Sequence, residues 1–243
     1  MHLLILGANS EVAQALAGKF AQNEGAHLYL ASRDLEVLAK QAGDLEIRFR
    51  VKAEPRFFEA TDYASHRAFY LGLNPPPDGV VLAFGYLGDQ EKAQEDFQEA
   101  KKIMDINFLG AMSILEIIAA DFSRRGHGFI IAISSVAGER GRQSNYIYGA
   151  AKGALSVYLS GLRQRLSPKG VRVLTVLPGF VQTKMTEHLD LPAKLMATPE
   201  EAAQDVYRAY RQNKEIIYTK WFWKWIMLII KALPEKIFKR AKL

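Results

Sequence analysis

The stretch from Ile130 to Lys152 constrains the fold of this chain more than any other. The apolar run Phe129 to Ile133 predicts a buried strand, and a glycine-containing loop leads from it into a segment with helical spacing. Tyr148 and Lys152 lie in that segment four residues apart, so they share one face of the predicted helix. A strand that passes through a loop into a helix is the repeating unit of α/β domains.

The pairing of Tyr148 with Lys152 also predicts a chemistry. An ammonium beside a phenol favours the phenolate and lowers a pKa that is ordinarily about 10. A tyrosine tuned in this way transfers protons near neutral pH. Ser135 stands at the exit of the predicted strand, thirteen residues before Tyr148, and offers a hydroxyl that can polarise a carbonyl. The competing interpretation is an ordinary contact on a helix surface.

The same spacing occurs a second time, at Tyr210 and Lys214. Here the residue thirteen positions before the tyrosine is Ala197, which has no hydroxyl. We therefore expect Tyr210 and Lys214 to lie on a solvated helix face, without a catalytic role.

Length and composition favour one α/β domain with a complete core. The chain has 243 residues, of which 49% are hydrophobic and 24% charged, and this excludes a disordered chain. It has no cysteine, which rules out disulfides and thiolate metal sites. The five histidines lack the spacing of metal ligands, so no metal site is expected; they are His2, His27, His66, His127 and His188. The N-terminus enters an apolar strand directly, so a cleaved signal peptide is not indicated.

The net charge of +6 is concentrated at one end of the chain. Residues 219–243 contain seven Lys and Arg and one acid, Glu235, whereas residues 1–218 contain 25 of each sign. A basic surface spread over the domain is therefore not predicted, and neither is nucleic-acid binding.

Several motifs stand together in a recognisable order and spacing. They are Gly7-Ala8-Asn9-Ser10, Leu82-Ala83-Phe84-Gly85, Asn107 in INFLG, Ser135, Tyr148, Lys152 and Pro178-Gly179. In this the chain resembles the classical short-chain dehydrogenases/reductases over residues 1–218. The resemblance implies a Rossmann-type, doubly wound parallel sheet of about seven strands with helices on both faces. It also implies four catalytic residues: Asn107, Ser135, Tyr148 and Lys152.

The resemblance further implies a dinucleotide site along the strand ends. Its expected residues are Gly7, Asn9, Ser10, Glu11, Val12, Ser32, Arg33, Glu59, Ala60, Ala83, Phe84, Gly85, Tyr148, Lys152, Pro178, Gly179, Val181 and Thr183. The family places glycines at positions 7, 11 and 13, where this chain has Gly7, Glu11 and Ala13. Gly7 suits a tight turn and Ala13 close helix packing. Glu11 suits the N-terminal end of the helix dipole, and we expect its side chain to point outward, away from the phosphates.

The residues after the second predicted strand bear on the choice of cofactor. Members that prefer NAD resemble one another in placing an acid there for the ribose hydroxyls. This chain has Ser32 and then Arg33, and a guanidinium suits a 2′-phosphate. NADP(H) is therefore favoured over NAD(H). The alternative is that Arg33 pairs with Asp34 or caps the next helix.

The spacing of apolar residues predicts the other strands and helices. Strands are expected at residues 2–6, 28–31, 57–60, 79–84, 170–177 and 214–219, and helices at 12–20, 63–73, 98–122 and from Thr198 to Arg211. By resemblance, residues 184–196 form a substrate lid whose Met and Leu side chains suggest an apolar substrate; the alternative is that they pack the lid against the core. Also by resemblance, the 98–122 helix and the helix after Tyr148 form a homodimer or homotetramer interface.

The tail is the segment 219–243. Its core, Trp221 to Leu233, is about 13 residues long and shorter than the roughly 20 that a bilayer span needs. As a helix it is apolar nearly all round, with Lys220, Lys224 and Lys231 on one narrow stripe. Aromatic residues with basic flanks are typical of helices lying in a lipid interface. Packing on a partner subunit is the alternative, and the membrane surface is favoured.

A narrower resemblance concerns the substrate. SSVAGERGRQSNYIYGAAK, AFGYLGDQ, PGFVQTKMTEHL and the tail look like the decaprenylphosphoryl-2-keto-erythro-pentose reductases. This implies a keto-sugar on a polyprenyl phosphate, reduced in the cytoplasm at the inner face of the membrane. A lipid, steroid or 3-oxoacyl ketone is the alternative substrate. A non-catalytic dinucleotide-binding adaptor at a membrane is the alternative of a different class, motivated by the incomplete glycine loop and by the tail.

Overall fold

The fold is built on a parallel sheet. The computed structural model describes residues 1–187, 189 and 191–241, and within them seven parallel strands form one sheet in the order β3-β2-β1-β4-β5-β6-β9. The strands are β1 (His2–Leu6), β2 (His27–Ser32), β3 (Ala53–Phe57), β4 (Gly79–Leu82), β5 (Gly128–Ile133), β6 (Val171–Pro178) and β9 (Ile216–Thr219). This confirms the predicted doubly wound sheet. The order reverses between β1 and β4, where ligands of such sheets bind.

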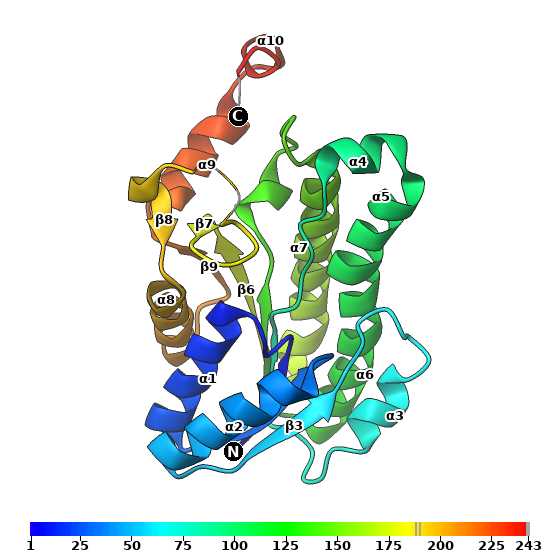
Figure 1. The fold of residues 1–243 in the computed structure, drawn as a ribbon, viewed down its shortest axis with the longest axis vertical. Coiled ribbons are helices and arrows are strands. Elements are labelled where there is room, and N and C mark those ends of the chain that lie inside the picture. The colour runs from blue at the N-terminus through cyan, green and yellow to red at the C-terminus, as the bar shows by residue number, and fades with distance from the viewer. Residues whose placement is uncertain (188, 190, 242–243) are drawn as a thin grey trace.

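Helices cover both faces of the sheet (Figure 1). One face carries α1 (Glu11–Glu24), α2 (Leu35–Phe49) and α8 (Pro199–Arg211). The other carries α3 (His66–Leu71), α6 (Gly110–Arg125) and α7 (Tyr146–Leu166). Two shorter helices, α4 (Gln90–Glu95) and α5 (Phe97–Met104), precede α6.

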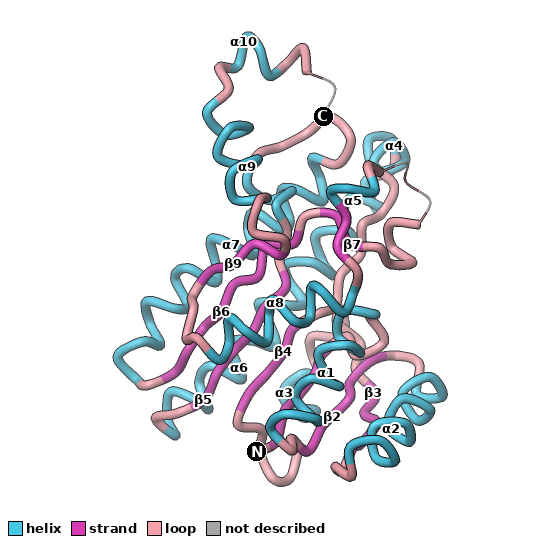
Figure 2. Tube along the Cα trace, turned by 90° about the vertical axis from the view of Figure 1, so that its left-hand side faces the viewer, coloured by secondary structure: helices cyan, strands magenta, loops and turns pink. Residues whose placement is uncertain are grey.

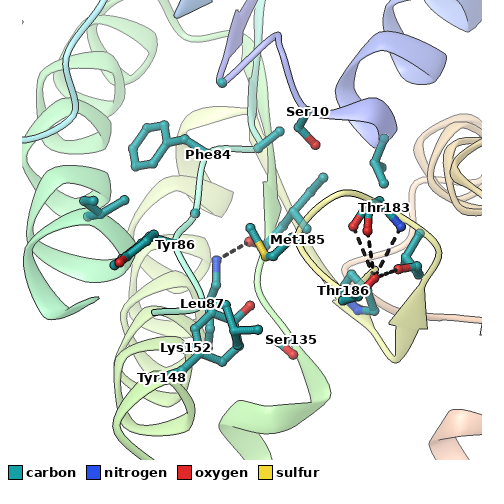
Figure 3. A pocket seen from close by; sticks show the side chains of 18 of the residues that line it. Ser10, Phe84, Tyr86, Leu87, Ser135, Tyr148, Lys152, Thr183, Met185 and Thr186 are labelled. Atoms are coloured by element: carbon teal, nitrogen blue, oxygen red, sulfur yellow. Dashed lines mark hydrogen bonds between the residues drawn. The ribbon is translucent and has the colours of Figure 1, made fainter. Parts of the chain in front are cut away.

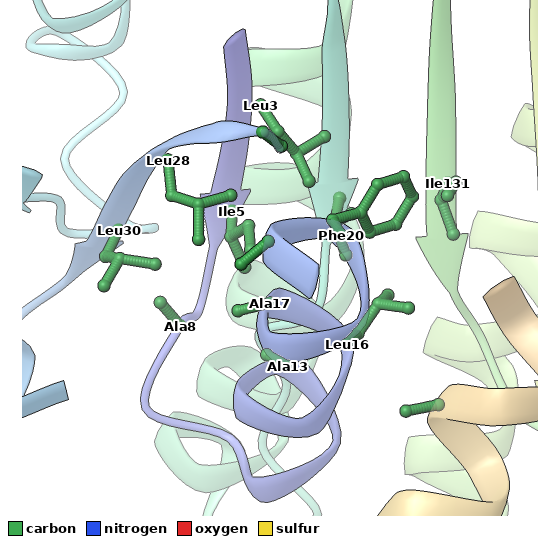
Figure 4. Packing of buried hydrophobic residues seen from close by; sticks show 14 of the residues in the cluster. Leu3, Ile5, Ala8, Ala13, Leu16, Ala17, Phe20, Leu28, Leu30 and Ile131 are labelled. Carbon is green, nitrogen blue, oxygen red and sulfur yellow. The ribbon is translucent and has the colours of Figure 1, made fainter. Parts of the chain in front are cut away.

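Alternation along the strands divides the core into these two layers. Leu3 and Ile5 of β1 pack against Phe20 of α1, whereas Leu4 and Leu6 face the opposite side of the sheet. All of them are fully buried, because a parallel sheet is covered on both faces and its strands read as continuous apolar runs. Figure 4 shows the first layer, with Phe20 and Leu16 of α1 beside the strands.

The third strand lies earlier than predicted. The pattern indicated residues 57–60, but β3 is Ala53–Phe57 and pairs only with β2. Pro55 obscured it, since proline cannot donate to a ladder and is tolerated only where, as here, the strand is at the edge. Phe58, Glu59 and Ala60 instead follow the strand and reach the end of the sheet.

The predicted 98–122 helix is interrupted. Residues Asp105–Leu109 form a π-helical turn between α5 and α6. The Asn107 amide donates to the carbonyl of Ile103 at 2.8 Å, the acceptor that its own backbone N–H would use in an α-helix. The N–H of Gly110 bonds the carbonyl of Asp105, five residues back. π-bulges of this kind are frequent at functional sites.

The stretch 97–125 is, among the described residues, the one helical segment long and apolar enough to cross a bilayer. Ile114, Leu115, Ile118 and Phe122 of this stretch are fully buried against the sheet. Its apolar composition is therefore explained by its place in the core.

The helix predicted to begin at Thr198 is confirmed as α8, with a capping box between Thr198 and Glu201. Before it, residues 180–181 (β7) and 196–197 (β8) make a separate two-stranded pair. The predicted lid, 184–196, connects them through turns and a short 3₁₀ helix at Ala193–Leu195. His188 and Asp190 in this segment lie outside the described residues.

The tail packs on its own domain. It forms α9 (Trp223–Ala232) and a short α10 (Glu235–Phe238) at one end of the molecule (Figures 1 and 2). Trp223, Met227 and Ile230 are buried against Val136 and Leu177 of the domain. The opposite side of the tail leaves large apolar side chains exposed: Trp221, Trp225, Leu228, Ile229 and Ile237.

Arg140 fixes the far end of α9. Its Nη1 donates to the carbonyls of Ile230 at 2.6 Å and Leu233 at 2.7 Å, and its Nη2 pairs with Glu235 at 3.0 Å. Carbonyls in the last turn of a helix lack intrahelical partners. A side chain from the loop between β5 and α7 thus satisfies the tail's helix terminus.

The predicted lysine stripe is wrong in part. Lys220 precedes α9, at φ 57°, and pairs with Glu201 of α8. Lys231 is on the helix but pairs with Glu139 of the domain. A helix start at Trp223 rather than Trp221 removes Lys220 from the stripe, and both lysines are held by acids of the domain. Lys242 and Leu243 lie outside the described residues.

Candidate active site

A cavity of about 440 Å³ opens at the carboxyl ends of the central strands. Its wall includes every residue predicted for cofactor binding, together with Ser135. Asn107, predicted as the fourth catalytic residue, is buried behind the wall. The residues predicted for cofactor binding therefore line one cavity, although they come from all along the chain.

Gly7 forms the turn between β1 and α1. Its φ is 84°, a conformation that side chains rarely adopt, and a Cβ on it would overlap the backbone N of Phe84. The Gly7 N–H donates to the carbonyl of Ala31 at 2.8 Å. Ala13, at the third glycine position, is fully buried in the core, so the close helix packing survives the substitution.

The N-terminus of α1 has polar groups left over for a ligand. Ser10 occupies the N-cap position but makes no side-chain capping bond. The Oδ1 atom of Asn9 is buried without a hydrogen-bond partner. Free N–H groups at a helix start favour phosphate. Together with the Gly7 turn, these residues fit the pyrophosphate of a dinucleotide.

Glu11 has a partner that the sequence did not suggest. Its Oε1 accepts a hydrogen bond from the backbone N–H of Lys184 at 3.0 Å. The carboxylate is thus directed at the first residue of the lid, and a residue that departs from the glycine pattern joins two walls of the cavity.

Arg33 lies at the other end of the cavity, after β2. Its guanidinium is 3.7 Å from the carboxylate of Glu59, and its side chain is 71% exposed. Asp34 instead caps α2, accepting the N–H groups of Glu36 and Val37. Arg33 therefore does not pair with Asp34, and Glu59 is its partner.

Ser135, Tyr148 and Lys152 gather at one side of the cavity, with Thr183 and Thr186 across from them (Figure 3). Ser135 lies two residues after the end of β5 and caps the short 3₁₀ helix Val136–Glu139, where the N–H of Ala137 donates to its Oγ at 3.1 Å. Its hydroxyl lies near Tyr148 and acts to lower the pKa of that phenol. Lys152 is buried, and its Nζ donates to the carbonyl of Ile133 at 3.1 Å.

The electrostatics of this cluster differ from the prediction. Burial raises the pKa of Tyr148 to about 12, against a lowering influence from the Ser135 hydroxyl. Burial also lowers the pKa of Lys152 to about 8. The Lys152 ammonium lies 5.8 Å from the centre of the Tyr148 ring and is directed at the Ile133 carbonyl. Desolvation therefore outweighs the cation in the protein by itself.

Asn107 anchors the loop that follows β4. Its Nδ2 donates to the carbonyl of Tyr86 at 2.6 Å, and its Oδ1 accepts the N–H of Tyr86 at 3.1 Å. Gly85 lies in between: a Cβ on it would come within 3.1 Å of Asn107 Oδ1 and 3.4 Å of Lys152 Nζ. The amide thus fixes the backbone beside the Lys152 ammonium.

The wall after β6 is supported by the tail. A Cβ on Gly179 would overlap the indole of Trp223, and the Phe180 ring meets that indole edge-on at 5.0 Å. The indole N–H donates to the carbonyl of Leu195 at the end of the lid, at 3.3 Å. Trp223 therefore touches both the strand exit and the lid. Farther along, the Thr186 hydroxyl donates to the Val181 carbonyl at 2.6 Å.

Some lining residues were not predicted. They are Phe58, Tyr86, Leu87, Lys102, Ile106, Ile133, Ser134, Val136, Ala137, Arg142, Asn145, Phe180 and Thr186. Arg142 and Asn145 precede Tyr148 by six and three residues, and their position in the loop between Ser135 and Tyr148 was a usable signal. Tyr86 and Leu87 gave a weaker signal in the sequence, because they follow the predicted Leu82–Gly85 motif and belong to no motif themselves.

The second Tyr-x-x-x-Lys pair is separate from the cavity. Tyr210 packs against Phe20 and Phe129, with ring centres 5.0 and 4.7 Å away. The helix ends at Arg211, so Lys214 is not on it. The prediction of a solvated helix face is therefore wrong in detail, because Tyr210 is half-buried.

Comparisons with known proteins agree with this geometry. The family model described as short chain dehydrogenase matches residues 1–193. An uncharacterized oxidoreductase of Mycobacterium tuberculosis is 36% identical over 98% of this chain and 96% of its own length. Another, from Streptomyces coelicolor, is 32% identical over 98% and 94%.

A solved structure shares the fold as well. The short-chain dehydrogenase from Sphingobium yanoikuyae in complex with NADPH has a TM-score of 0.83 at 21% identity, covering 96% of each chain. The family model and the two relatives cover most of the sequence, and the chain belongs to the short-chain dehydrogenase family of oxidoreductases.

Proposed function

We propose that the protein reduces a ketone to an alcohol with NADPH. The observation that carries this proposal is the grouping of Ser135 and Tyr148, with Lys152 one helical turn farther on, in the wall of a cavity that also contains the Gly7 turn. The bound nicotinamide would supply the hydride. Ser135 would polarise the carbonyl oxygen, and Tyr148 would give it a proton.

The protonation states support reduction. A phenol whose pKa is about 12 holds its proton at neutral pH, and this is the form that an acid catalyst needs. Alcohol oxidation would require the phenolate instead. Lys152, with a pKa of about 8, is mainly cationic at pH 7 and would bind the cofactor ribose. Asn107 would sustain proton supply by holding the chain beside Lys152.

NADP(H) is the proposed cofactor. Arg33 is exposed and its ion pair with Glu59 is long, at 3.7 Å, so its guanidinium is available to a 2′-phosphate. Ser32 beside it is a hydrogen-bond donor rather than an acid. The NADPH complex of the Sphingobium relative is consistent with this choice. Ser10, Val12, Val181 and Thr183 would line the remaining length of the dinucleotide.

For the substrate we propose a keto-sugar linked to a polyprenyl phosphate. The lining residues Leu87, Phe180, Met185 and Leu189 give one part of the cavity an apolar wall, suited to a substrate with a hydrocarbon part. A lipid, steroid or 3-oxoacyl ketone would use the same wall. The relative activities on these ketones decide between them.

The tail is proposed to lie on the inner face of the cytoplasmic membrane. Trp221 and Trp225 are 74% and 54% exposed, and Leu228 and Ile229 are 55% and 64% exposed. Lys224 is exposed on the same helix, and indole rings with basic neighbours suit a lipid interface. Sedimentation with anionic vesicles tests this. Trp225→Ser with Leu228→Ser should abolish binding, and binding that survives both changes would refute it.

The unit in solution is proposed to be a homodimer or homotetramer. Val157 of α7 and Phe97 of α5 are each 75% exposed, and their helices lie side by side. Sedimentation equilibrium of Val157→Asp tests the assignment. A monomer is expected, and an unchanged mass would place the interface elsewhere.

The reaction itself is tested by NADPH oxidation with a panel of ketones. Tyr148→Phe should reduce kcat about 100-fold or more, the contribution of a general acid. Tyr210→Phe is the matched control, since it removes the same hydroxyl outside the cavity. Binding of NADPH without turnover of any ketone would favour the non-catalytic adaptor.

A further inference from the structure

Arg142 is a buried cation in the cavity wall. It lies in the loop between β5 and α7, and only 8% of the residue is exposed. Its guanidinium is always charged near neutral pH. Placing such a charge away from water is costly unless it is paired or fully hydrogen-bonded.

Arg142 has no anionic partner within the described part of the chain. It takes part in none of the ion pairs formed there. Its Nη2 donates to the thioether of Met227 at 3.2 Å, which is a weak and uncharged acceptor. Its Nε is buried without any hydrogen-bond partner. Burial accordingly lowers the pKa of Arg142 from its ordinary value.

One oxygen of Glu139, the acid whose charge acts on Arg142, is already occupied. Glu139 acts on Arg142 only through space. Its Oε1 accepts the hydroxyl of Tyr218 at 2.9 Å and pairs with Lys231 of the tail. Glu139 therefore holds the tail through one carboxylate oxygen, while its Oε2 is buried without a hydrogen-bond partner and forms no ion pair with the guanidinium.

A second unsatisfied group stands next to Arg142. Asn145 also lines the cavity, and its Oδ1 is buried without a partner. The backbone N–H of Asn145 donates to the carbonyl of Arg142 at 3.1 Å, which holds the two residues in one turn. A guanidinium that can bind an anion and an amide oxygen that can accept a hydrogen bond from a hydroxyl therefore lie next to each other in the cavity wall.

The position of Arg142 separates it from the proposed 2′-phosphate site. Arg33 follows β2, whereas Arg142 follows β5 and contacts α9. In the sheet order, β2 and β5 are three places apart, which corresponds to about 14 Å at the usual strand spacing. Arg142 also precedes Tyr148 by only six residues, so it belongs to the half of the cavity where the carbonyl would lie.

The charges of the cavity point the same way. Its described lining includes four cations, Arg33, Lys102, Arg142 and Lys152, and two acids, Glu11 and Glu59. Glu11 is engaged by the Lys184 N–H and Glu59 by Thr61 and Arg33. The cavity is therefore electropositive beyond Arg33 and Lys152, the two cations assigned to the cofactor.

We propose that Arg142 binds an anionic group of the substrate, a phosphate ester or a carboxylate, while Ser135 and Tyr148 hold its carbonyl. The Oδ1 atom of Asn145 accepts a hydrogen bond from a hydroxyl of the same substrate. This inference rests on the proposed reductase function and deepens it, because it makes Arg142 the residue that selects charged ketones over neutral ones.

The test is a binding measurement that needs no turnover. Ribulose 5-phosphate and ribulose are titrated calorimetrically into the enzyme saturated with NADP⁺, and so are 4-oxopentanoate and its methyl ester. At least one anionic ligand should bind about tenfold or more tightly than its neutral counterpart, as expected for a charge-assisted hydrogen bond. The pair that shows the preference identifies phosphate or carboxylate as the group.

Variants then assign the preference to Arg142. Arg142→Gln should bring the anionic-to-neutral ratio close to one, and Arg142→Lys should restore part of it. Arg48→Gln is the matched control, because it removes the same charge from an exposed position on α2. Equal binding within both pairs, no measurable binding of either anion, or a preference that survives Arg142→Gln would overturn the proposal.

Two readouts separate this proposal from its alternatives. If Arg142 only supported α9 through Met227, Arg142→Gln would lower the melting temperature and weaken both members of a pair equally, which would contradict anion binding. Tyr148→Phe should reduce kcat about 100-fold or more and keep the anion preference. Loss of the proposed reaction and loss of the anion site are therefore distinguishable.

Discussion

The carboxylate of Glu11 and the backbone N–H of Lys184 are 3.0 Å apart, although 173 residues separate them in the sequence. The bond ties the start of α1, where pyrophosphate would bind, to the start of the lid. Glycine at position 11 would leave this lid residue without its acceptor. Where the family has glycine, this chain therefore has a side chain that joins the start of α1 to the start of the lid at one edge of the cavity.

The first prediction concerns this bond. Glu11→Ala should increase the dissociation rate of NADPH about fivefold, the effect of losing one hydrogen bond worth about 1 kcal/mol. Glu11→Gln keeps an acceptor and should resemble the wild type. Stopped-flow release of NADPH, followed by its fluorescence, measures both. Equal rates in all three proteins would mean that the bond does not hold the lid.

The second prediction is a pH limit set by Lys152. Its pKa of about 8 means that the ammonium is lost as pH rises through that value. Reduction at saturating NADPH should therefore decline above about pH 8. Lys152→Arg keeps its charge at higher pH, so whatever activity it retains should persist there. A wild-type profile that stays level to pH 10 would contradict the role given to Lys152.

The third prediction compares two tryptophans on one helix. Trp223 is 3% exposed and Trp225 is 54% exposed. Trp223→Ala should lower the free energy of unfolding by about 3–5 kcal/mol through the cavity it leaves, whereas Trp225→Ala should change it by about 0.5 kcal/mol or less. Urea unfolding measures the difference. Similar losses in both variants would show that α9 does not pack as described.

The fourth prediction concerns Arg33. Arg33→Gln should lower the preference for NADPH over NADH by about tenfold, because a charge-assisted bond to the 2′-phosphate is lost. The ratio of kcat/KM for the two cofactors measures it, with Arg48→Gln as the control for net charge. An unchanged ratio would assign the 2′-phosphate to other residues.

The fifth prediction is the effect of pH on stability through His66. This residue is fully buried, its ring nitrogens contact Ser113 at 2.9 Å and the Glu59 carbonyl at 3.2 Å, and burial lowers its pKa from 6.5. The unfolded chain therefore binds the proton more readily. Stability should be complete above pH 6.5 and fall on acidification below it, by at most about 1.4 kcal/mol per pH unit.

His66→Gln should remove this part of the pH dependence, whereas the same change at exposed His27 should not. Unfolding free energies between pH 7 and 5 give the comparison. An identical slope in wild type and His66→Gln would show that another group is responsible.

Local patterns were sufficient for much of the fold. Continuous apolar runs located β1, β2 and β5, because strands covered on both faces contain few polar residues. The same patterns missed β3, since Pro55 at a sheet edge resembles a loop. The spacing known from the family predicted that residues far apart in the sequence, such as Gly7 and Tyr148, belong to one site, and both line the cavity.

What the sequence could not show depends on distant contacts. The Asn107 side chain in the π turn bonds Tyr86, and the Glu11 carboxylate bonds the N–H of Lys184, and both partners are distant in the sequence. The pKa of Tyr148 was expected to fall because only its neighbour on the helix was visible. Its burial, which dominates, follows from the assembled walls.

The two faces of α9 have a consequence for how a substrate arrives. Trp223 on the inner face touches Gly179 and the lid, and Trp225 on the outer face meets the surroundings. Only the thickness of a helix, roughly 10 Å, separates those surroundings from the reaction chamber. If the tail lies on a bilayer as proposed, the hydrocarbon part of a lipid-linked substrate would have only a short path along the protein surface from that bilayer to the cavity.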